Sequence, residues 1–506
     1  MKKKKQDKKK HTPTFTIFII TIVIMIASFV FSILGIDAEK AAVVNGTLET
    51  SLSVVNNIFS VDGLQYILNH IASNFAVFEP LALLIISLIG ISIGETSGLF
   101  KAIFNPLRKV NLTIVTFITL FLGVLGSFFG GSAYAILIPF SAVMYQYIGR
   151  NPLVGAMTAF LGITAGYGTN ILFSNDDYIL GQLTELSATV EIDKTYQYHL
   201  MSNSIIMVVS TILFVIIGTI IINRFLANKF PRKYKLDDEV VISKKGLLAT
   251  LITLLIMVAI VIYMVIPGLK FPASGALLDF ESDIYVEQLL GENSPFRNGF
   301  VFIITVIITA CSLVYGKVSG TMDSSRAYGT GLSKSFKDLG YLFVLMFLVS
   351  VMISVLNYTN LGEVIACKLI DFTSSIPMTG LPLIVLTFFI IILISIFIPD
   401  LQTKWTLASP LFIPLFMKAN ITPDFTQFLF KAADGMGKCF SPIFIYFIVL
   451  VGFLEKYSHK NEQITIFGTM RVMLPAIILF TIFWLLIIVG WYVVGLPLGY
   501  GSYPTL

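Results

Sequence analysis

Two clusters of polar side chains interrupt an otherwise apolar chain, one in each half. The first cluster consists of Ser127, Ser132, Thr164, Thr169, Asn170, Asp176 and Asp177, and the second of Asp400, Gln402, Thr403, Lys431, Asp434 and Ser441. Hydroxyl, amide and carboxylate oxygens can bind Na⁺ or a proton, and an ammonium group can bind an anion. A nucleophile with its base, or a set of metal ligands, does not accompany them in the sequence. The residue types therefore indicate binding and not enzymatic catalysis.

The two clusters share one spacing. In each half a proline is followed 14 positions later by a glycine and 18 positions later by a polar residue: Pro152, Gly166 and Asn170, then Pro423, Gly437 and Ser441. Small and polar residues at these points would break a membrane-length segment. A pair of broken helices at corresponding places in two halves is typical of the midplane site of a secondary transporter.

The composition is that of a membrane protein. Of the 506 residues, 56% are hydrophobic and only 12% are charged, which is far too apolar for a soluble globular chain. Unbroken apolar runs near the length needed to cross a bilayer lie at Phe15–Ile36, Val77–Gly98, Met201–Ile222, Leu247–Ile266, Gly299–Val318, Leu339–Val355 and Met473–Val494. The first run is too long for the apolar part of a signal peptide. The three cysteines suggest neither a disulfide framework nor a metal cluster.

The distribution of lysine and arginine predicts the orientation of the spans. The basic N-terminal tail and the basic loop at 224–245 go to the cytoplasmic side, and the acidic segment at 268–297 goes outside. Segment 111–149 then begins and ends inside, and segment 380–420 begins and ends outside. Each is predicted to be a re-entrant hairpin, with an ordinary pair of tightly connected helices as the alternative.

The sequence thus predicts an all-α polytopic membrane protein. It would have about nine transmembrane helices, two re-entrant hairpins and two broken helices, at roughly 152–186 and 423–454, in an inverted-topology repeat. The predicted division is a basic cytoplasmic tail (1–12), spans 1 and 2 (13–110), repeat 1 (111–223), a cytoplasmic loop with scaffold spans 5 and 6 (224–337), and repeat 2 (338–506). The N-terminus would lie in the cytoplasm and the C-terminus outside, in the cytoplasmic membrane.

Ionisable side chains at membrane depth are costly and are candidates for function. Lys431 and Asp434 lie three residues apart, so they share a helix face and could form a pair that either binds substrate or holds the helix in place. Asp177 could instead lie at the solvated outer end of its span, Asp400 could cap the following helix, and Lys404 could reach toward the membrane interface.

Three stretches of the chain carry a familiar pattern. They are GETSGLF (94–100), SAYAILIPFSAVMYQYIGRNPLVGAMTAFLGITAGYGTNILFSNDDYILGQLT (132–184) and TKWTLASPLFIPLFMKANITPDFTQFLFKAADGMGKCFSPIFIYF (403–447). In residues, order and spacing the sequence resembles the AbgT family of p-aminobenzoyl-glutamate transporters. The resemblance implies nine spans and two hairpins, a homodimer, and secondary transport. It also associates the chain with uptake of p-aminobenzoyl-glutamate or export of sulfonamide antimetabolites.

The functional positions of that family can be carried over one by one. Those that match are Asp177, Trp405, Pro423, Asp434 and Pro442. Three positions depart: an arginine of the family is Lys431 here, a serine is Gln402, and an aspartate is Gly131. A lysine keeps the charge of an arginine but loses its planar, bidentate fork for a carboxylate.

The leading hypothesis is a secondary active transporter of a small organic anion, most like p-aminobenzoyl-glutamate. The alternatives are a proton-driven exporter of sulfonamide-type drugs and a carrier of another anion, such as a dicarboxylate or a lipid-linked headgroup. The predicted substrate-binding residues are Asp177, Asn170, Gln402, Trp405, Pro423, Lys431, Asp434 and Pro442. The predicted ion-coupling residues are Ser132, Thr169, Asn170, Asp177, Asp400, Thr403, Asp434 and Ser441. No cofactor is expected, and the coupling ion is either H⁺ or Na⁺, with a possible Na⁺ near Asn170 and Thr403.

Overall fold

The computed structural model describes residues 11–44, 46–231, 242–334, 336, 339–457 and 464–506. Most of the basic tail and half of the basic loop at 224–245 lie outside the described residues. Contacts between Cα atoms divide the chain into two compact units. Unit 1 comprises Met1–Phe78, Leu180–Ile206 and Tyr341–Leu506, and unit 2 comprises Glu79–Ile179 and Met207–Gly340. The predicted division into repeats and scaffold remains a prediction.

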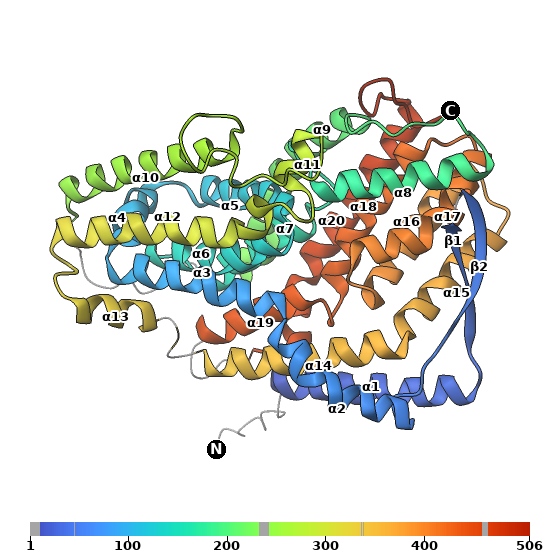
Figure 1. Ribbon diagram of the computed structural model, residues 1–506, viewed down its shortest axis with the longest axis horizontal. Helices are drawn as coiled ribbons and strands as arrows, with labels where there is room; N and C mark the ends of the chain where they lie inside the picture. Colours follow the sequence, from blue (N-terminus) through green and yellow to red (C-terminus); the bar gives the residue numbers. More distant parts are fainter. Residues whose placement is uncertain (1–10, 45, 232–241, 335, 337–338, 458–463) are drawn as a thin grey trace, which may run out of the picture. The chain divides into compact units, whose positions relative to one another are not determined.

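In the described part of unit 2 the secondary-structure elements are helices (Figure 1). Its helices are α3 (Glu79–Thr96), α4 (Leu99–Phe104), α5 (Leu112–Gly126), α6 (Gly131–Tyr147), α7 (Pro152–Thr164), α10 (Lys244–Val265), α11 (Tyr285–Leu290), α12 (Pro295–Ser319) and α13 (Ser325–Lys334). Short tight turns of helix lie at Asn105–Lys109, Ser127–Phe129 and Ala227–Lys229, and a π-helical turn lies at Ile222–Leu226. Helices α8 (Asn175–Glu191) and α9 (Ser204–Ile221) each have residues in both units.

Unit 1 contains helices and one β-hairpin. The helices are α1 (Pro13–Ile33), α2 (Val61–Ala76), α14 (Gly340–Thr359), α15 (Leu361–Ser375), α16 (Gly380–Phe397), α17 (Leu401–Lys418), α18 (Pro423–Phe440), α19 (Ile445–Tyr457) and α20 (Ile466–Val494). The strands β1 (Asp37–Val44) and β2 (Thr47–Val54) pair antiparallel, with Val44 opposite Thr47.

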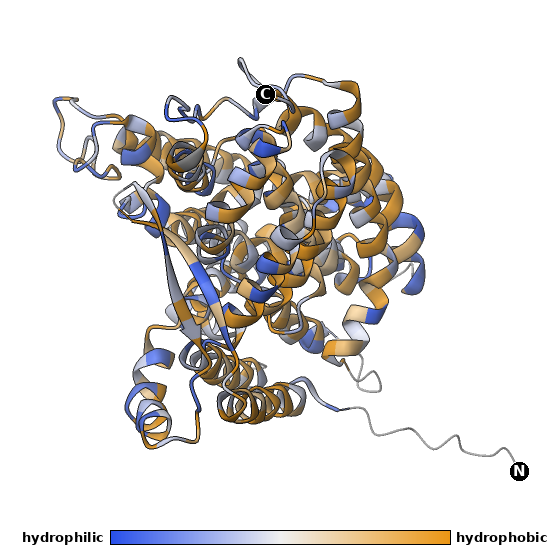
Figure 2. Cartoon of the chain, turned by 90° about the vertical axis from the view of Figure 1, so that its right-hand side faces the viewer, coloured by the Kyte–Doolittle hydropathy of each residue, from blue (hydrophilic) through white to orange (hydrophobic). Residues whose placement is uncertain are grey.

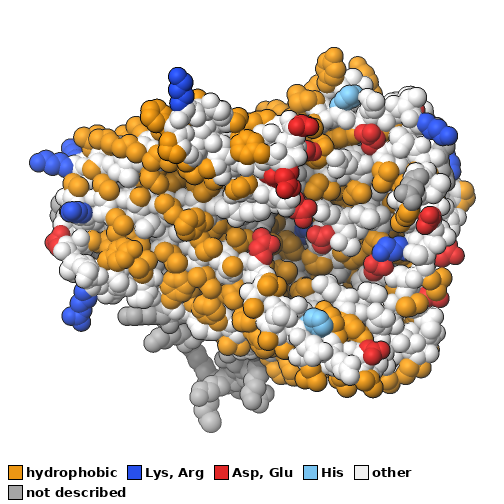
Figure 3. Space-filling view, viewed as in Figure 1, with side chains coloured by type: hydrophobic (Ala, Val, Ile, Leu, Met, Phe, Trp, Pro, Cys, Tyr) orange, Lys and Arg blue, Asp and Glu red, His pale blue; other side chains and the backbone are white. Residues whose placement is uncertain are grey.

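The membrane-spanning character of the chain is confirmed. Within the described ranges, nine helices are long and apolar enough to cross a bilayer, or up to ten if the bent pair α18 and α19 counts as one span. Seven of the nine overlap the seven unbroken runs expected from the sequence, and the other two are α5 and α16. Most of the ribbon has a hydrophobic colour in Figure 2, and hydrophobic side chains are spread over the face drawn in Figure 3. A surface with so much apolar area is unfavourable in contact with water and is expected to face lipid.

Both expected helical hairpins are present as pairs of helices. In the first, α5 and α6 are joined by a turn at Ser127–Phe129, followed by Gly130 at φ 53°. In the second, α16 ends at Phe397 and α17 begins at Leu401. Whether each pair enters and leaves on one side of the membrane stays a prediction.

Both expected breaks are present as well, but they differ in length. The first span is interrupted between Thr164, where α7 ends, and Asn175, where α8 begins. In the second, α18 and α19 are separated only by residues 441–444 and bend by 41°. The equal spacing in the sequence therefore marks corresponding places without fixing the length of the unwound segment.

Glycine lets each hairpin approach its broken helix closely. A Cβ on Gly437 of α18 would lie 2.4 Å from the Ser395 Cβ and 2.6 Å from the Ile392 carbonyl oxygen, both on α16. A Cβ on Gly162 of α7 would lie 2.9 Å from the Leu120 carbonyl oxygen of α5. Such contacts are shorter than van der Waals packing allows, so only glycine fits there.

The predicted all-α membrane fold is confirmed, and one described segment departs from helix. Residues 37–54, within the stretch predicted to hold spans 1 and 2, form the β1–β2 hairpin, and the sequence between its two strands is Asn-Gly, at 45–46. Asn-Gly is the strongest short signal for a tight hairpin turn, because both turn positions need positive φ. Lys40 of β1 forms an ion pair with Glu363 of α15 at 3.3 Å, and Ser53 of β2 donates to the same carboxylate at 2.8 Å.

Candidate functional site

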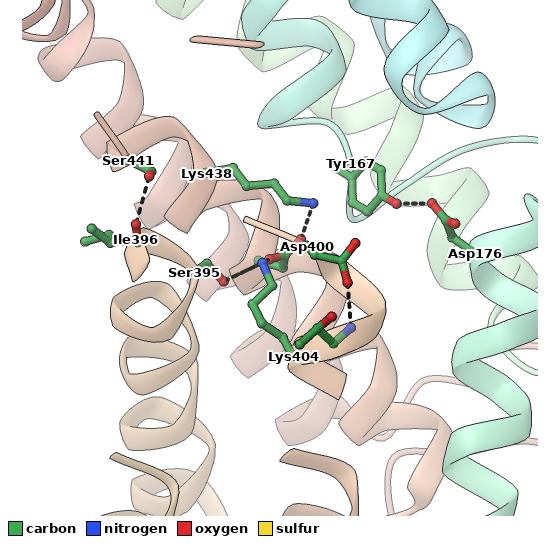
Figure 4. A network of polar contacts seen from close by, with 10 residues as sticks. Tyr167, Asp176, Ser395, Ile396, Asp400, Lys404, Lys438 and Ser441 are labelled. Carbon is green, nitrogen blue, oxygen red and sulfur yellow. Dashed lines mark hydrogen bonds and ion pairs between the residues drawn. The ribbon is translucent and has the colours of Figure 1, made fainter. Parts of the chain in front are cut away.

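The second polar cluster is centred on Asp434 of α18. Figure 4 labels its partners Ser395, Lys404 and Lys438. Its Oδ1 accepts hydrogen bonds from the Lys404 ammonium and, at 2.8 Å, from the Ser395 hydroxyl. Its Oδ2 lies 2.8 Å from the Nζ of Lys438, one turn further along α18. Lys404 and Asp434 are fully buried, and the Lys438 side chain is 8% exposed. One buried carboxylate is therefore shared by two ammonium groups, so each of the three buried charges has a partner of opposite sign.

The surrounding backbone explains why these side chains meet. The carboxylate of Asp400 accepts from the Thr403 backbone N–H at 2.7 Å and caps α17, so Lys404 lies in the first turn of that helix. Ser441 ends α18, and its hydroxyl donates to the Ile396 carbonyl at 2.9 Å. The end of α16, the start of α17 and the end of α18 are thus held at one place. The capping alternative for Asp400 is what the structure shows.

Trp405 anchors α17 inside unit 1. Its side chain is fully buried, and its indole Nε1 donates to the Leu180 carbonyl at 3.2 Å and to the Thr184 hydroxyl at 3.0 Å. Its ring lies 4.3 Å from that of Phe430, centroid to centroid. The interface alternative for the neighbouring Lys404 does not hold, because its side chain is enclosed by protein.

The other predicted residues of the second half lie around this network. Lys431 is 5% exposed and lies on α18, and Pro423 is the first residue of that helix. Gln402 is half-buried and Thr403 is exposed, both in the first turn of α17. Pro442 is half-buried in the break after α18.

In unit 2, Asn170 connects the first break to the first hairpin tip. Its Nδ2 donates to the Val124 carbonyl at 3.0 Å and to the Ser127 hydroxyl at 3.1 Å. Its Oδ1 accepts from the backbone N–H groups of Ile171 and Leu172 at 2.8 and 3.2 Å. Both lone pairs of that oxygen are therefore occupied in this conformation, and a cation would have to displace an N–H group to reach it.

A hydroxyl cluster surrounds Thr169. Its Oγ1 donates to the Met207 carbonyl and lies 2.8 Å from the Ser210 hydroxyl and 2.6 Å from the Thr211 hydroxyl, all on α9. Thr164, at the end of α7, lies 3.1 Å from the Tyr134 hydroxyl. These contacts join the break to the neighbouring helices.

The paired aspartates lie in the first turn of α8, where the partial positive charge of the helix end favours carboxylates. Asp176 accepts from the Tyr167 hydroxyl. Asp177 accepts from the backbone N–H and the hydroxyl of Ser174, each at 2.8 Å. Asp177 is 4% exposed, so the solvated alternative for it does not hold. Ser132, also predicted for ion coupling, is buried in the first turn of α6.

The start of α18 has a polar network of its own. The Asp424 carboxylate accepts from the hydroxyls of Tyr196 and Ser502, each at 2.8 Å. Asn203 donates to the Asp424 carbonyl at 3.0 Å. Burial, together with the nearby Asp424 carboxylate, raises the pKa of Tyr196, so its hydroxyl remains a donor at any physiological pH. Two separate segments thereby fix the first turn of α18.

Sequence reasoning missed several of these residues. It chose Lys431 as the partner of Asp434, named Lys404 but not as a partner of that carboxylate, and missed Lys438, although Lys438 lies at i+4 on the same helix, a spacing at which side chains meet. Ser395 and Asp424 carried no local signal, since their partners come from distant segments. Across the described residues, no group of three or more His, Cys, Asp or Glu could hold a metal ion.

Comparisons with known proteins place this geometry in context. The model of the AbgT putative transporter family matches residues 7–506. The p-aminobenzoyl-glutamate transport protein of Escherichia coli (strain K12) is 26% identical over 499 residues, which cover 97% of this chain and 94% of that protein.

Two solved structures are similar to the chain. The YdaH transporter of Alcanivorax borkumensis is 26% identical, with 97% of this chain and 100% of that chain covered and a TM-score of 0.48. MtrF of Neisseria gonorrhoeae, described as illuminating a class of antimetabolite efflux pumps, is also 26% identical, with 98% of each chain covered and a TM-score of 0.49. Because the family model matches nearly the whole length, the chain is a multi-pass membrane protein that belongs to the AbgT transporter family.

Proposed function

We propose that this chain is a secondary active transporter that carries p-aminobenzoyl-glutamate, or a closely related aromatic carboxylate, across the cytoplasmic membrane. The single observation that supports it most is the buried network of Lys404, Asp434 and Lys438 at the junction of a helical hairpin and a broken helix. Ammonium groups held at membrane depth suit a carboxylate substrate. The relative from Escherichia coli is named for transport of p-aminobenzoyl-glutamate, which supports the choice of substrate.

In this proposal the broken segments supply the binding and coupling groups. The break at residues 441–444 frees backbone groups that a ligand can satisfy, and Lys431 and Lys438 provide positive charge on α18. Asp434 in unit 1 and Asp177 in unit 2 are the buried carboxylates assigned to the coupling ion. Trp405, which packs on Phe430, holds α17 so that Lys404 reaches Asp434.

The experiment that tests this function is uptake of labelled p-aminobenzoyl-glutamate into proteoliposomes. A Na⁺ gradient and a proton gradient are imposed separately, with Asp177→Asn and Asp434→Asn alongside wild type. Saturable uptake driven by one gradient, and reduced in either variant, would support the substrate and identify the coupling ion. Uptake under neither gradient by folded wild type would refute p-aminobenzoyl-glutamate import. Extrusion of a sulfonamide by the same vesicles would then favour the exporter.

Two further features belong to the proposal. Only 6% of the most apolar window of α10 is buried, and 22% of that of α1. Such surfaces need lipid or a second copy of the chain to cover them, which supports a homodimer. Mass photometry of the purified protein would test the dimer. Labelling of single cysteines placed at residue 12 and at residue 505 from each side of the membrane would test an N-terminus in the cytoplasm and a C-terminus outside.

A further inference from the structure

The two lysines that share Asp434 are not equivalent. Lys404 contacts Oδ1, the oxygen that also accepts from Ser395, and both Lys404 and Asp434 are fully buried. Lys438 lies 2.8 Å from the other oxygen, Oδ2, and its side chain retains 8% exposure. Lys404 is in the first turn of α17, whereas Lys438 is in the last turn of α18, directly before the break.

We propose that Lys438 is the exchangeable cation of this network: it leaves Asp434 to bind a carboxylate of the transported anion, while Lys404 stays paired with Asp434. The identity of the anion rests on the proposed function. The different roles of Lys438 and Lys404 are inferred from the geometry of unit 1.

Lys438 can leave Asp434 at low energetic cost because the carboxylate contacts two ammonium groups at once. Removing the partner of a buried carboxylate is costly, because the charge is left without compensation in a medium of low dielectric. If Lys438 turned away, Asp434 would still have the Lys404 ammonium and the Ser395 hydroxyl on Oδ1. Lys438 can therefore change partners without stranding a buried charge. Lys404, whose side chain has no exposed surface, lacks that freedom.

The surroundings of Lys438 suit an aromatic carboxylate. Its Nζ lies 6.0 Å from the centre of the Phe444 ring, and Phe444 is in the unwound segment between α18 and α19. A cation beside an aromatic face can bind a carboxylate while the ligand's ring packs on the aromatic side chain. Within this segment the N–H groups of Ser441 and Phe444 already donate to the carbonyls of Lys438 and Ser441, and Pro442 has no N–H, so the ligand's recognition is assigned to Lys438 and Phe444.

The test separates a bound carboxylate from a structural role. Binding of p-aminobenzoyl-glutamate and of its uncharged diamide is measured for wild type, Lys438→Gln, Lys438→Arg and the control Lys368→Gln, an exposed lysine of α15 in the same unit. We expect Lys438→Gln to weaken binding of the carboxylate ligand about tenfold to a hundredfold, as for a lost charged hydrogen bond. Binding of the diamide should hardly change. Lys438→Arg should retain most of the affinity, and Lys368→Gln all of it.

The outcomes are distinct from those that test the proposed function. If wild type binds p-aminobenzoyl-glutamate and Lys438→Gln binds it equally well, or loses both ligands equally, the role of Lys438 is refuted and the transport proposal stands.

If wild type binds neither ligand, thermal unfolding is measured with benzoate and with glutarate. Stabilisation of wild type that Lys438→Gln loses would support Lys438 with a different anion, and its absence would refute Lys438. If neither Lys438→Gln nor Lys438→Met gives a monodisperse protein, the Lys404 ammonium alone does not compensate the buried charge of Asp434, and the inference is refuted.

Discussion

Replacing Asp434 with asparagine tests whether the buried network is held together by charge. An asparagine side chain has the same shape as an aspartate, so the substitution leaves no cavity and changes mainly the charge. Two ammonium groups would lose the carboxylate that both contact. Removing one partner of a buried ion pair costs about 3–5 kcal/mol. We therefore expect Asp434→Asn to lower the free energy of unfolding by about that amount.

The sharper test is a double substitution. Lys404 is fully buried, and Met has a similar length without the charge. If the cost of Asp434→Asn comes from stranded charge, adding Lys404→Met should recover part of it, because an apolar residue of similar volume tolerates the same site. The double variant should thus be more stable than Asp434→Asn alone. Unfolding in mixed micelles with increasing SDS, followed by tryptophan fluorescence, measures the difference.

The control is the partly exposed pair of Lys40 and Glu363, whose side chains are 33% and 25% exposed. Lys40→Gln should cost less than about 1 kcal/mol, as is usual for solvent-exposed ion pairs. A double variant less stable than Asp434→Asn, or a cost for Asp434→Asn no larger than that of Lys40→Gln, would refute the reasoning.

Three further substitutions test the packing around the site. Gly437→Ala should lower the free energy of unfolding by about 1–3 kcal/mol and reduce transport, because the added Cβ would lie 2.6 Å from the Ile392 carbonyl oxygen. The control is Gly490→Ala on α20, where no atom lies within 4 Å of the added Cβ. This control should leave stability unchanged or raise it. Tyr196→Phe should lower the free energy of unfolding by about 1.5–3 kcal/mol through the lost hydrogen bond to the Asp424 carboxylate, and an unchanged value would contradict that bond. Trp405→Phe keeps the ring beside Phe430 but leaves the Leu180 carbonyl and Thr184 without the indole donor, so we expect a loss of about 1–3 kcal/mol in the same unfolding assay and slower uptake.

Much of the fold followed from local sequence signals. Apolar length alone located the seven unbroken spans, since the bilayer sets how many residues a crossing helix needs. The distribution of lysine and arginine located both helical hairpins, and the spacing of proline, glycine and polar residues located both breaks, because such residues interrupt helices. The β1–β2 hairpin had a signal too, the Asn-Gly pair at 45–46, which a search for apolar runs does not detect.

The site was less predictable because its contacts join distant segments. Ser395 and Lys404 reach Asp434 only because α16 and α17 pack beside α18, and Gly437 permits that approach. No spacing in the sequence shows that Trp405 meets residues of α8. Lys438 is the exception: its i+4 relation to Asp434 was visible, and Lys431 at i−3 was an equally good partner on the helix alone. The contact between Lys438 and Asp434 came only with the structure, because helical spacing alone does not distinguish the two lysines.

Cys439 follows Lys438 at the end of α18 and is fully buried, and the other two cysteines, Cys311 and Cys367, are buried as well. A thiol in that position cannot react with a maleimide until the helix end opens. The rate of its alkylation would therefore measure that opening, without the introduction of a new cysteine into the protein. A rate that changes with substrate would report the motion of this helix end in the native chain, while Cys311 and Cys367 serve as internal references.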